Sequence, residues 1–175
     1  PPPPPPPPPP PFFFQAEHAI RDPLWSRGLG DVYKRQDKAV GEPFIHADRE
    51  TRWQKISNTK GFWEGLDWYP GGKRLYSFIA KYDPHILSAY STKDANSRRG
   101  KLKWLAKNTK IPRGKTHLVL REDKQKYAVN RDGSSNILID DYIKNIEEFN
   151  AKGGIGIHHT DTGKTLRELK NLGFK

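Results

Sequence analysis

Cysteine and methionine are both absent from this 175-residue chain. Without cysteine, the chain has no disulfide framework and no thiolate metal site. The missing methionine predicts that the natural start of the reading frame is not part of this sequence. No apolar run approaches the roughly 20 residues that a membrane-spanning helix needs. We therefore expect a cytoplasmic protein that has no membrane partner.

The first 36 residues differ in kind from the rest of the chain. Pro1 to Pro11 form an unbroken proline tract, and three phenylalanines follow it. Residues 12–36, most specifically the segment SRGLGDVYKRQ, resemble the translation of a sequencing-library adapter, and the proline tract then resembles a translated homopolymer. A genuine polyproline II arm is the alternative. We expect residues 1–36 to be a disordered, non-native leader outside the fold.

The remaining 139 residues, 37–175, are enough for one domain with its own core. The whole chain carries 31 Lys and Arg against 20 Asp and Glu, a net charge of +11. Four of these cations and three of these acids precede residue 37, so +10 remains in the later part. A basic balance favours anionic partners such as nucleotides, other phosphorylated compounds or nucleic acid.

Two regions follow the leader. Residues 37–80 are rich in aromatics and have helical spacing, with helices expected at 50–57 and 73–81. From residue 81 to 175, expected strands at 86–90, 116–120, 136–139 and 155–158 alternate with expected helices at 97–108, 142–152 and 162–172. In the helix at 97–108, Leu102, Leu105 and Ala106 are expected to face inward. Such alternation predicts an α/β fold, a parallel sheet covered by helices.

Two adjacent aspartates end one of the expected strands. Ile137, Leu138 and Ile139 form an apolar run typical of a strand buried on both faces, and Asp140 and Asp141 follow directly. Open α/β sheets bind ligands at the carboxyl ends of their strands. Neighbouring carboxylates repel, and a hard cation such as Mg2+ relieves the repulsion. The alternative is a helix start capped by Asp141.

Other strand ends also carry polar groups. Ser88, at the end of the first of these strands, could hold a phosphate oxygen together with exposed backbone N–H groups. Lys124 follows the second strand and could neutralise charge on a phosphoryl group, although a solvated surface lysine is the alternative. His158 and His159 end the last strand. Neighbours on a strand point to opposite faces, which makes them a poor chelating pair.

A hydroxyl, a lysine and an acid pair, in that order along the chain, resemble the motifs of the haloacid dehalogenase-like phosphohydrolases. The resemblance is closest to the 5'(3')-deoxyribonucleotidase branch and its phage and bacterial relatives. It rests on ILSAYS with Ser88, REDK with Lys124 and ILIDD with Asp140 and Asp141, and on GFWEGLDWYPGGKRLYSFI, residues 61–79. It implies a three-layer Rossmann-like parallel sheet, residues 81–175, with a remnant of a small helical cap, residues 37–80.

The resemblance also implies a role for each motif. The parent protein would be a Mg2+-dependent phosphatase that hydrolyses nucleoside monophosphates through an aspartyl-phosphate. Asp141 would hold the metal, and Asp140 would bind it through water or orient Lys124. Ser88 and the backbone N–H of Ala89 would bind phosphate oxygens, and Lys124, with Lys126 as its rival, would offset developing charge.

Three aromatic residues complete the sites that the resemblance implies. Phe62, Trp63 and Trp68 could form an apolar wall against a nucleobase, and packing of the cap on the core is the alternative for each.

One motif of this family is missing. The family uses an Asp-x-Asp near its N-terminus, and no Asp-x-Asp occurs in these 175 residues. We therefore expect an N-terminally truncated, metagenomic fragment that lacks its nucleophile and its first strand and has no phosphatase activity. A basic nucleic-acid-binding module and a noncatalytic interaction domain are the alternative functions, although the aspartate pair makes nucleic acid the less expected partner.

Overall fold

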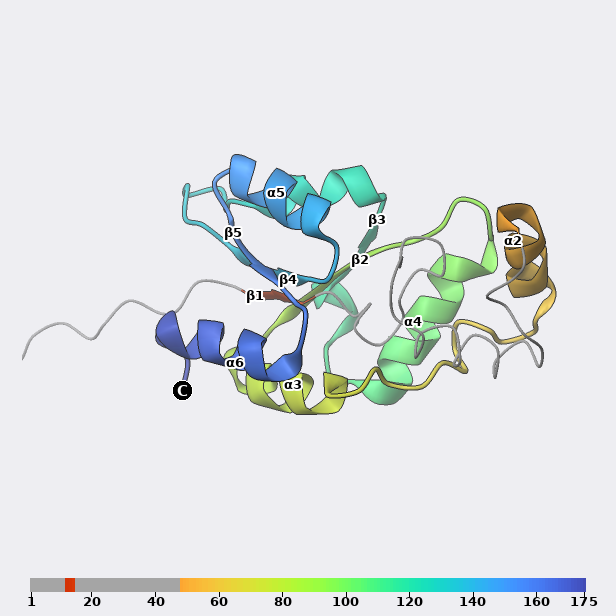
Figure 1. Ribbon diagram of the computed structural model, residues 1–175, viewed down its shortest axis with the longest axis horizontal. Coiled ribbons are helices and arrows are strands. Elements are labelled where there is room, and N and C mark those ends of the chain that lie inside the picture. Colours follow the sequence, from red (N-terminus) through yellow and green to blue (C-terminus); the bar gives the residue numbers. More distant parts are fainter. Residues whose placement is uncertain (1–11, 15–47) are drawn as a thin grey trace, which may run out of the picture.

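The computed structural model describes residues 12–14 and 48–175. Helices and parallel strands alternate along the described chain, so the expected α/β class is confirmed at this level (Figure 1). The helices are α2 (Arg49–Asn58), α3 (Gly72–Ile79), α4 (Asn96–Asn108), α5 (Ile143–Ala151) and α6 (Thr162–Asn171), with short 3₁₀ helices η2 (Ala80–Tyr82), η3 (Arg113–Lys115) and η4 (Arg121–Tyr127).

Five parallel strands form one sheet in the order β3-β2-β1-β4-β5. They are β1 (Phe12–Phe14), β2 (His85–Ala89), β3 (Thr116–Val119), β4 (Ile137–Asp140) and β5 (Ile155–His158). The four strands expected from the sequence after residue 81 are all present, each within about two residues of the expected bounds. Hydrophobic periodicity was sufficient for these strands because each is short, apolar and bounded by polar or glycine residues.

The central strand corrects the expectation that residues 1–36 stay outside the fold and that the first strand is missing. Phe12–Phe14 lies between β2 and β4, with Phe14 in register with both Ile86 and Ile139. The physical reason is that β2 and β4 each present a row of backbone hydrogen-bonding groups on this side, and an apolar aromatic triplet pairs with both rows. The rest of the predicted leader lies outside the described residues.

Side chains alternate between the two faces of the sheet and form two hydrophobic clusters. Leu87, Leu138 and Phe13 pack with Ile146 and Phe149 of α5 on one face. The larger cluster, on the other face, contains Ile86, Ile137 and Ile139 with residues of α3, α4 and α6. In Figure 1, α5 accordingly lies on one side of the sheet and α3 and α6 on the other.

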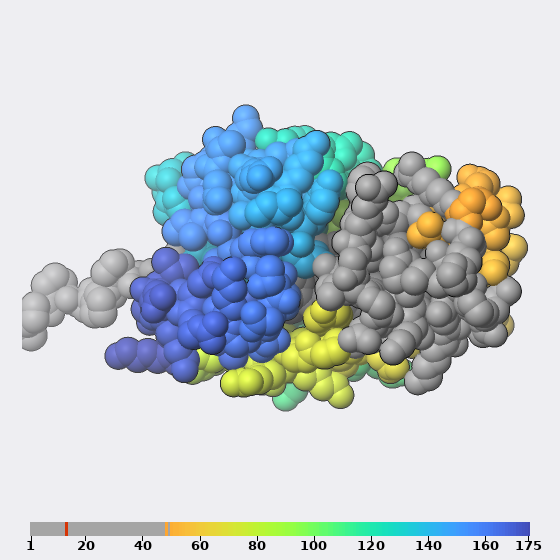
Figure 2. Space-filling model, viewed as in Figure 1, coloured from red at the N-terminus to blue at the C-terminus, as the bar shows by residue number. Residues whose placement is uncertain are grey.

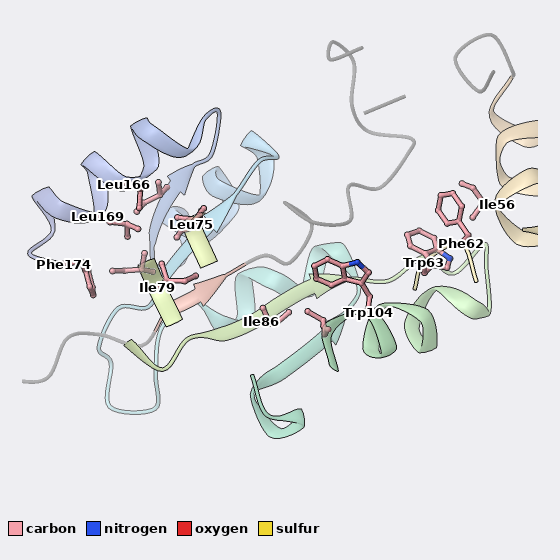
Figure 3. Close-up of a cluster of buried hydrophobic side chains, with 14 of the residues drawn as sticks. Ile56, Phe62, Trp63, Leu75, Ile79, Ile86, Trp104, Leu166, Leu169 and Phe174 are labelled. Carbon is pink, nitrogen blue, oxygen red and sulfur yellow. The ribbon is translucent and has the colours of Figure 1, made fainter. Parts of the chain in front are cut away.

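The larger cluster extends from the sheet to the segment before α3. Figure 3 shows Ile56, Phe62 and Trp63 packed together at one end, and Leu166, Leu169 and Phe174 at the other. Residues 53–63 and residues 81–175 therefore share this cluster. The division of the chain at residue 80 into a cap and a core stays a prediction. Figure 2 shows α2 at one end of the molecule and α6 toward the other.

Helix ends lie within about two residues of the expected positions, and the buried face of α4 is the one correction. Asp48 caps α2 by accepting a hydrogen bond from the backbone N–H of Thr51. The cap of α6 is Asp161, whose carboxylate accepts a hydrogen bond from the backbone N–H of Lys164. In α4, Leu105 is buried as expected, but Ala106 is exposed and the buried face runs through Ser97, Lys101 and Trp104.

No helix among the described residues has the length and apolar character needed to cross a membrane.

Candidate functional site at the carboxyl ends of the strands

Asp140 is the last residue of β4 and is completely buried. Burial of a carboxylate requires an opposite charge and hydrogen bonds. Its Oδ2 lies 3.1 Å from Lys124 Nζ, and Lys124 is itself only 1% exposed. The structure thus places a buried ion pair at the strand end that the sequence singled out.

Lys124 and its rival Lys126 occupy different environments in η4. Lys124 points inward to Asp140. The Lys126 side chain is 72% exposed and pairs with Asp123 on the same surface, at 2.6 Å. The pair with Asp123 raises the pKa of Lys126. Of the two, only Lys124 is placed to present a fixed charge at the end of β4.

Asp140 is held by more than the lysine. Its Oδ2 also accepts a hydrogen bond from Asn145 Nδ2 at 2.8 Å, and its Oδ1 accepts from the backbone N–H of Tyr142 at 2.8 Å. The first turn after β4 is therefore closed by Asp140 and not by Asp141, which corrects the suggested capping role of Asp141. Of the two roles expected for Asp140, this geometry supports the orientation of Lys124.

Asp141 follows on the opposite side of the backbone and is partly exposed. Its backbone carbonyl lies 3.1 Å from His158 Nε2 at the end of β5. His159 turns to the other side, where its Nδ1 lies 2.7 Å from Thr165 Oγ1. The two histidines thus point apart, as expected for neighbours on a strand, and do not form a chelating pair.

The end of β2 carries the second half of the site. Ser88 is 1% exposed, and its Oγ lies 3.5 Å from Lys101 Nζ. Lys101, from α4, also donates to the backbone carbonyl of Ala89 and lies over the Trp63 ring at 5.3 Å. Lys101 is only 2% exposed. A hydroxyl and a buried ammonium group therefore meet at this strand end.

The burial of Lys101 was not predicted from the sequence, in which it lies among the basic residues Arg98, Arg99 and Lys103. The available signal was the helical stripe of Ser97, Lys101, Trp104 and Leu105, which repeats at the spacing of one helix face. A lysine on a stripe with a tryptophan and a leucine is expected to extend its stem across the core.

The two halves lie at the same edge of the sheet. Ile86 and Ile139 are both in register with Phe14, so Ser88 and Asp141 each lie two residues further toward the carboxyl end. Strand β1 separates them, which puts the two strands about 10 Å apart. Lys101 approaches from the face covered by α4, and Lys124 from the face covered by α5 and η4.

The three aromatic residues expected to line a nucleobase site pack into the protein. Phe62 and Trp63 are buried with their rings edge to face at 5.2 Å, and Trp68 packs edge to face against Trp104 at 4.9 Å. Trp63 Nε1 donates to the buried Asp94 carboxylate at 2.6 Å. A Cβ on Gly100 would lie 2.5 Å from Trp63, so this glycine permits the close approach of α4. Packing is therefore an observed role of these residues.

A cavity of about 420 Å³ lies between the end of α2, the following turn and the start of α4. Phe62 and Trp63 form part of its wall, whereas Trp68 does not. Its lining includes Lys60, Arg99 and Lys103 but none of Ser88, Lys124, Asp140 or Asp141. Trp63 lies between this cavity and the end of β2, because its ring also contacts Lys101.

The donor set fits only part of a magnesium site. Carboxylate oxygen is the ligand that Mg2+ prefers, and Asp141 supplies one at the strand edge. Asp140 is engaged by Lys124 and Asn145. Within residues 12–14 and 48–175, no group of three or more His, Asp or Glu side chains is placed to hold a metal ion.

Comparison of the chain with models of known protein families found no match, and comparison with curated proteins found no significant match.

Proposed function

We propose that the chain is a phosphate-ester-binding domain with a three-layer, haloacid dehalogenase-like core, of the kind that acts on nucleoside monophosphates. The observation that carries this proposal is the buried pair of Lys124 and Asp140 at the carboxyl end of β4. Burial of a lysine is costly in free energy unless an opposite charge and hydrogen bonds compensate it. Here the partner is a carboxylate at the sheet edge where α/β proteins bind ligands.

The anion would lie between the two halves of the site. Ser88 would donate a hydrogen bond to a phosphate oxygen, and Lys101 and Lys124 would approach from opposite faces of the sheet. Two ammonium groups fixed by neighbouring oxygens give a phosphate preorganised charge compensation with little reorganisation. The backbone at Ala89 is held by Lys101, which keeps this strand end in one conformation.

A bound Mg2+ ion would add charge neutralisation at the phosphate, and Asp141 is the residue that would hold it. Since Asp141 lacks further clustered ligands among the described residues, we expect Mg2+ to bind weakly to this chain. The nucleoside would extend toward Trp63 and the cavity of about 420 Å³ beside it. The cavity lining carries three cations, Lys60, Arg99 and Lys103, against two acids, Glu64 and Asp94, and this excess of one positive charge favours a ligand that carries negative charge.

Phosphate binding is the first test. Inorganic phosphate and deoxynucleoside monophosphates should bind the 175-residue chain, measured by calorimetry at low salt. Lys124→Met should reduce the affinity severely, because it removes a fixed charge at the site. Lys126→Met changes a lysine two residues away that is exposed, and it should bind phosphate as the unaltered chain does. Equal affinities for both variants would contradict the proposal.

Catalysis is the second test. The sequence contains no Asp-x-Asp, so the unaltered chain should release no phosphate from deoxynucleoside monophosphates in Mg2+. Gln15→Asp with Glu17→Asp places an Asp-x-Asp directly after Phe14 in the sequence, next to the strand that separates the two halves of the site. We expect EDTA-sensitive release from this double variant and its loss on adding Asp141→Asn. Robust turnover by the unaltered chain would show that the nucleophile lies elsewhere.

Nucleic-acid binding is the second candidate, and α4 favours it. This helix exposes Arg98, Arg99, Lys103 and Lys107 and has no acidic residue, whereas its Lys101 is buried. Glu64 offsets part of this charge, since it pairs with Lys103 at 2.8 Å and the pair lowers the pKa of Glu64. Affinity for single-stranded DNA that falls steeply with salt, and falls further in Arg99→Ala with Lys107→Ala, would support this candidate.

A further inference from the structure

We propose that Asn145 is a positioning residue that holds Asp140, and through Asp140 the ammonium group of Lys124, at the strand edge. The functional meaning of this role rests on the proposed phosphate site. Asn145 lies in the first turn of α5 and is buried, with 4% of its surface exposed. Its Nδ2 donates to Asp140 Oδ2 at 2.8 Å, the same oxygen that accepts from Lys124.

The orientation of the Asn145 amide is set from its other side. Its Oδ1 accepts a hydrogen bond from Arg121 Nη1 at 3.2 Å. A guanidinium only donates and a carboxylate only accepts, so the amide oxygen must face Arg121 and the amide nitrogen must face Asp140. The reversed amide would place two donors in contact at Arg121 and two acceptors in contact at Asp140.

Arg121 is in turn fixed by a bidentate pair with Glu148. Nη1 lies 2.7 Å from Oε2 and Nη2 lies 3.3 Å from Oε1. This pair raises the pKa of Arg121 and lowers the pKa of Glu148, and both side chains are about one-quarter exposed. A planar guanidinium held at both nitrogens has one orientation, and this fixes the direction in which Nη1 donates to Asn145.

The network contains two ion-pair rungs, one from η4 to α5 and one from η4 to the end of β4. Arg121 and Lys124 are three residues apart on η4, and Asn145 and Glu148 are three residues apart on α5. Arg121 with Glu148 forms the outer, partly exposed rung. Lys124 and Asp140 form the inner, buried rung, which Asn145 connects to the outer one. The arrangement fixes the position of Lys124 without placing any group of α5 in the phosphate site.

Competitive acetylation of lysines in the 175-residue chain tests this role. Acetic anhydride labelling followed by peptide mass spectrometry measures how often each amine becomes accessible. We expect Asn145→Ala to raise the labelling rate of Lys124 roughly tenfold, which corresponds to the loss of one hydrogen bond to a charged group. Arg121→Met should raise it less, since Arg121 acts through Asn145. Glu147→Gln, an exposed position on α5, should leave it unchanged.

Two other lysines serve as internal references. Lys126 is exposed and should label at the same rate in all variants. Lys101 is buried outside the network, so its rate reports general loosening of the fold. A rise at Lys124 without a rise at Lys101 supports the positioning role. Equal rises at both lysines, or no rise at Lys124, would overturn it. The labelling does not depend on phosphate, so loss of the proposed function would leave this result standing.

Discussion

The sheet buries two polar pairs, one fully and one partly. The first is Lys124 with Asp140, and the second is His85 with His117. Lys124 and Asp140 carry opposite charges at the end of β4. His85 Nδ1 and His117 Nε2, on neighbouring strands β2 and β3, lie 2.9 Å apart with rings tilted by only 3° and centroids 5.2 Å apart. These values describe two nearly coplanar rings joined end to end, which share one proton in an N–H···N hydrogen bond.

The two pairs differ in the charges that they can carry when buried. An ammonium and a carboxylate compensate each other and can both remain ionised when buried and hydrogen-bonded. Two imidazolium ions would repel across the shared hydrogen bond, so the histidine pair must hold at most one charge. Burial lowers the pKa of both histidines, and nearby Lys115 lowers that of His85 further. The first pair keeps two charges at the end of β4, where we propose that an anion binds, whereas the second joins β2 to β3.

Breaking the charged pair should have the largest effect. Lys124→Met leaves Asp140 buried without its ammonium partner, which should lower the free energy of unfolding by about 3–5 kcal/mol. Lys126→Met should have no measurable effect, because that lysine is solvated. Urea unfolding monitored by tryptophan fluorescence measures both. Adding Asp140→Leu to Lys124→Met should recover part of the loss; a further loss instead would mean that the hydrogen bonds from Asn145 and the Tyr142 N–H stabilise Asp140 by more than its burial costs.

Removal of the Phe13 side chain, which packs against the histidine pair, should have the next largest effect. Phe13 is buried on β1, and its ring lies 5.2 Å from His85, 5.8 Å from His117 and 5.5 Å from Tyr127. Phe13→Ala should cost about 3 kcal/mol of stability through the cavity it leaves. It should also raise both histidine pKa values by admitting water, which NMR titration of the imidazole protons measures. An unchanged unfolding midpoint would show that Phe12–Phe14 does not form the central strand in solution.

Protonation of the histidine pair should have the smallest effect. The folded pKa values are lower than those of the unfolded chain, so the folded state binds fewer protons. The contribution to stability is therefore present above the unfolded pKa, about 6.5, and is lost as the pH falls through the folded values. Urea midpoints between pH 7.5 and pH 5 should decline in the unaltered chain and decline less in His117→Gln. Identical slopes in both proteins would remove the histidine pair as the cause.

Much of the fold could be predicted because its signals are local. The run Ile137 to Ile139 ending in two aspartates, and the two glycines after α5, are features that the backbone responds to within a few residues. The candidate site at the end of β4 could be predicted for the same reason, since the carboxyl end of a buried parallel strand has one location in such a sheet.

The errors occurred where partners come from distant parts of the chain. Phe12–Phe14 was assigned to a leader because its neighbours in sequence resemble an adapter, but a short strand is decided by the two strands that flank it. The burial of Lys101 was not predicted, because its neighbours in sequence are basic. Its side chain instead contacts the Trp63 ring, 38 residues away in sequence, and the end of β2, 12 residues away.

By itself, the sequence determined the alternation of strands and helices, the strand ends at which Ser88 and Asp140 stand, and the basic charge that favours an anionic ligand. Only the tertiary structure decided between Lys124 and Lys126, brought Lys101 to Ser88, and linked Asn145 to Asp140 and Arg121. The physical reason is range. Backbone periodicity depends on neighbours along the chain, whereas the burial of a charge depends on which opposite charges and hydrogen-bonding groups the packed helices bring within about 3 Å of it.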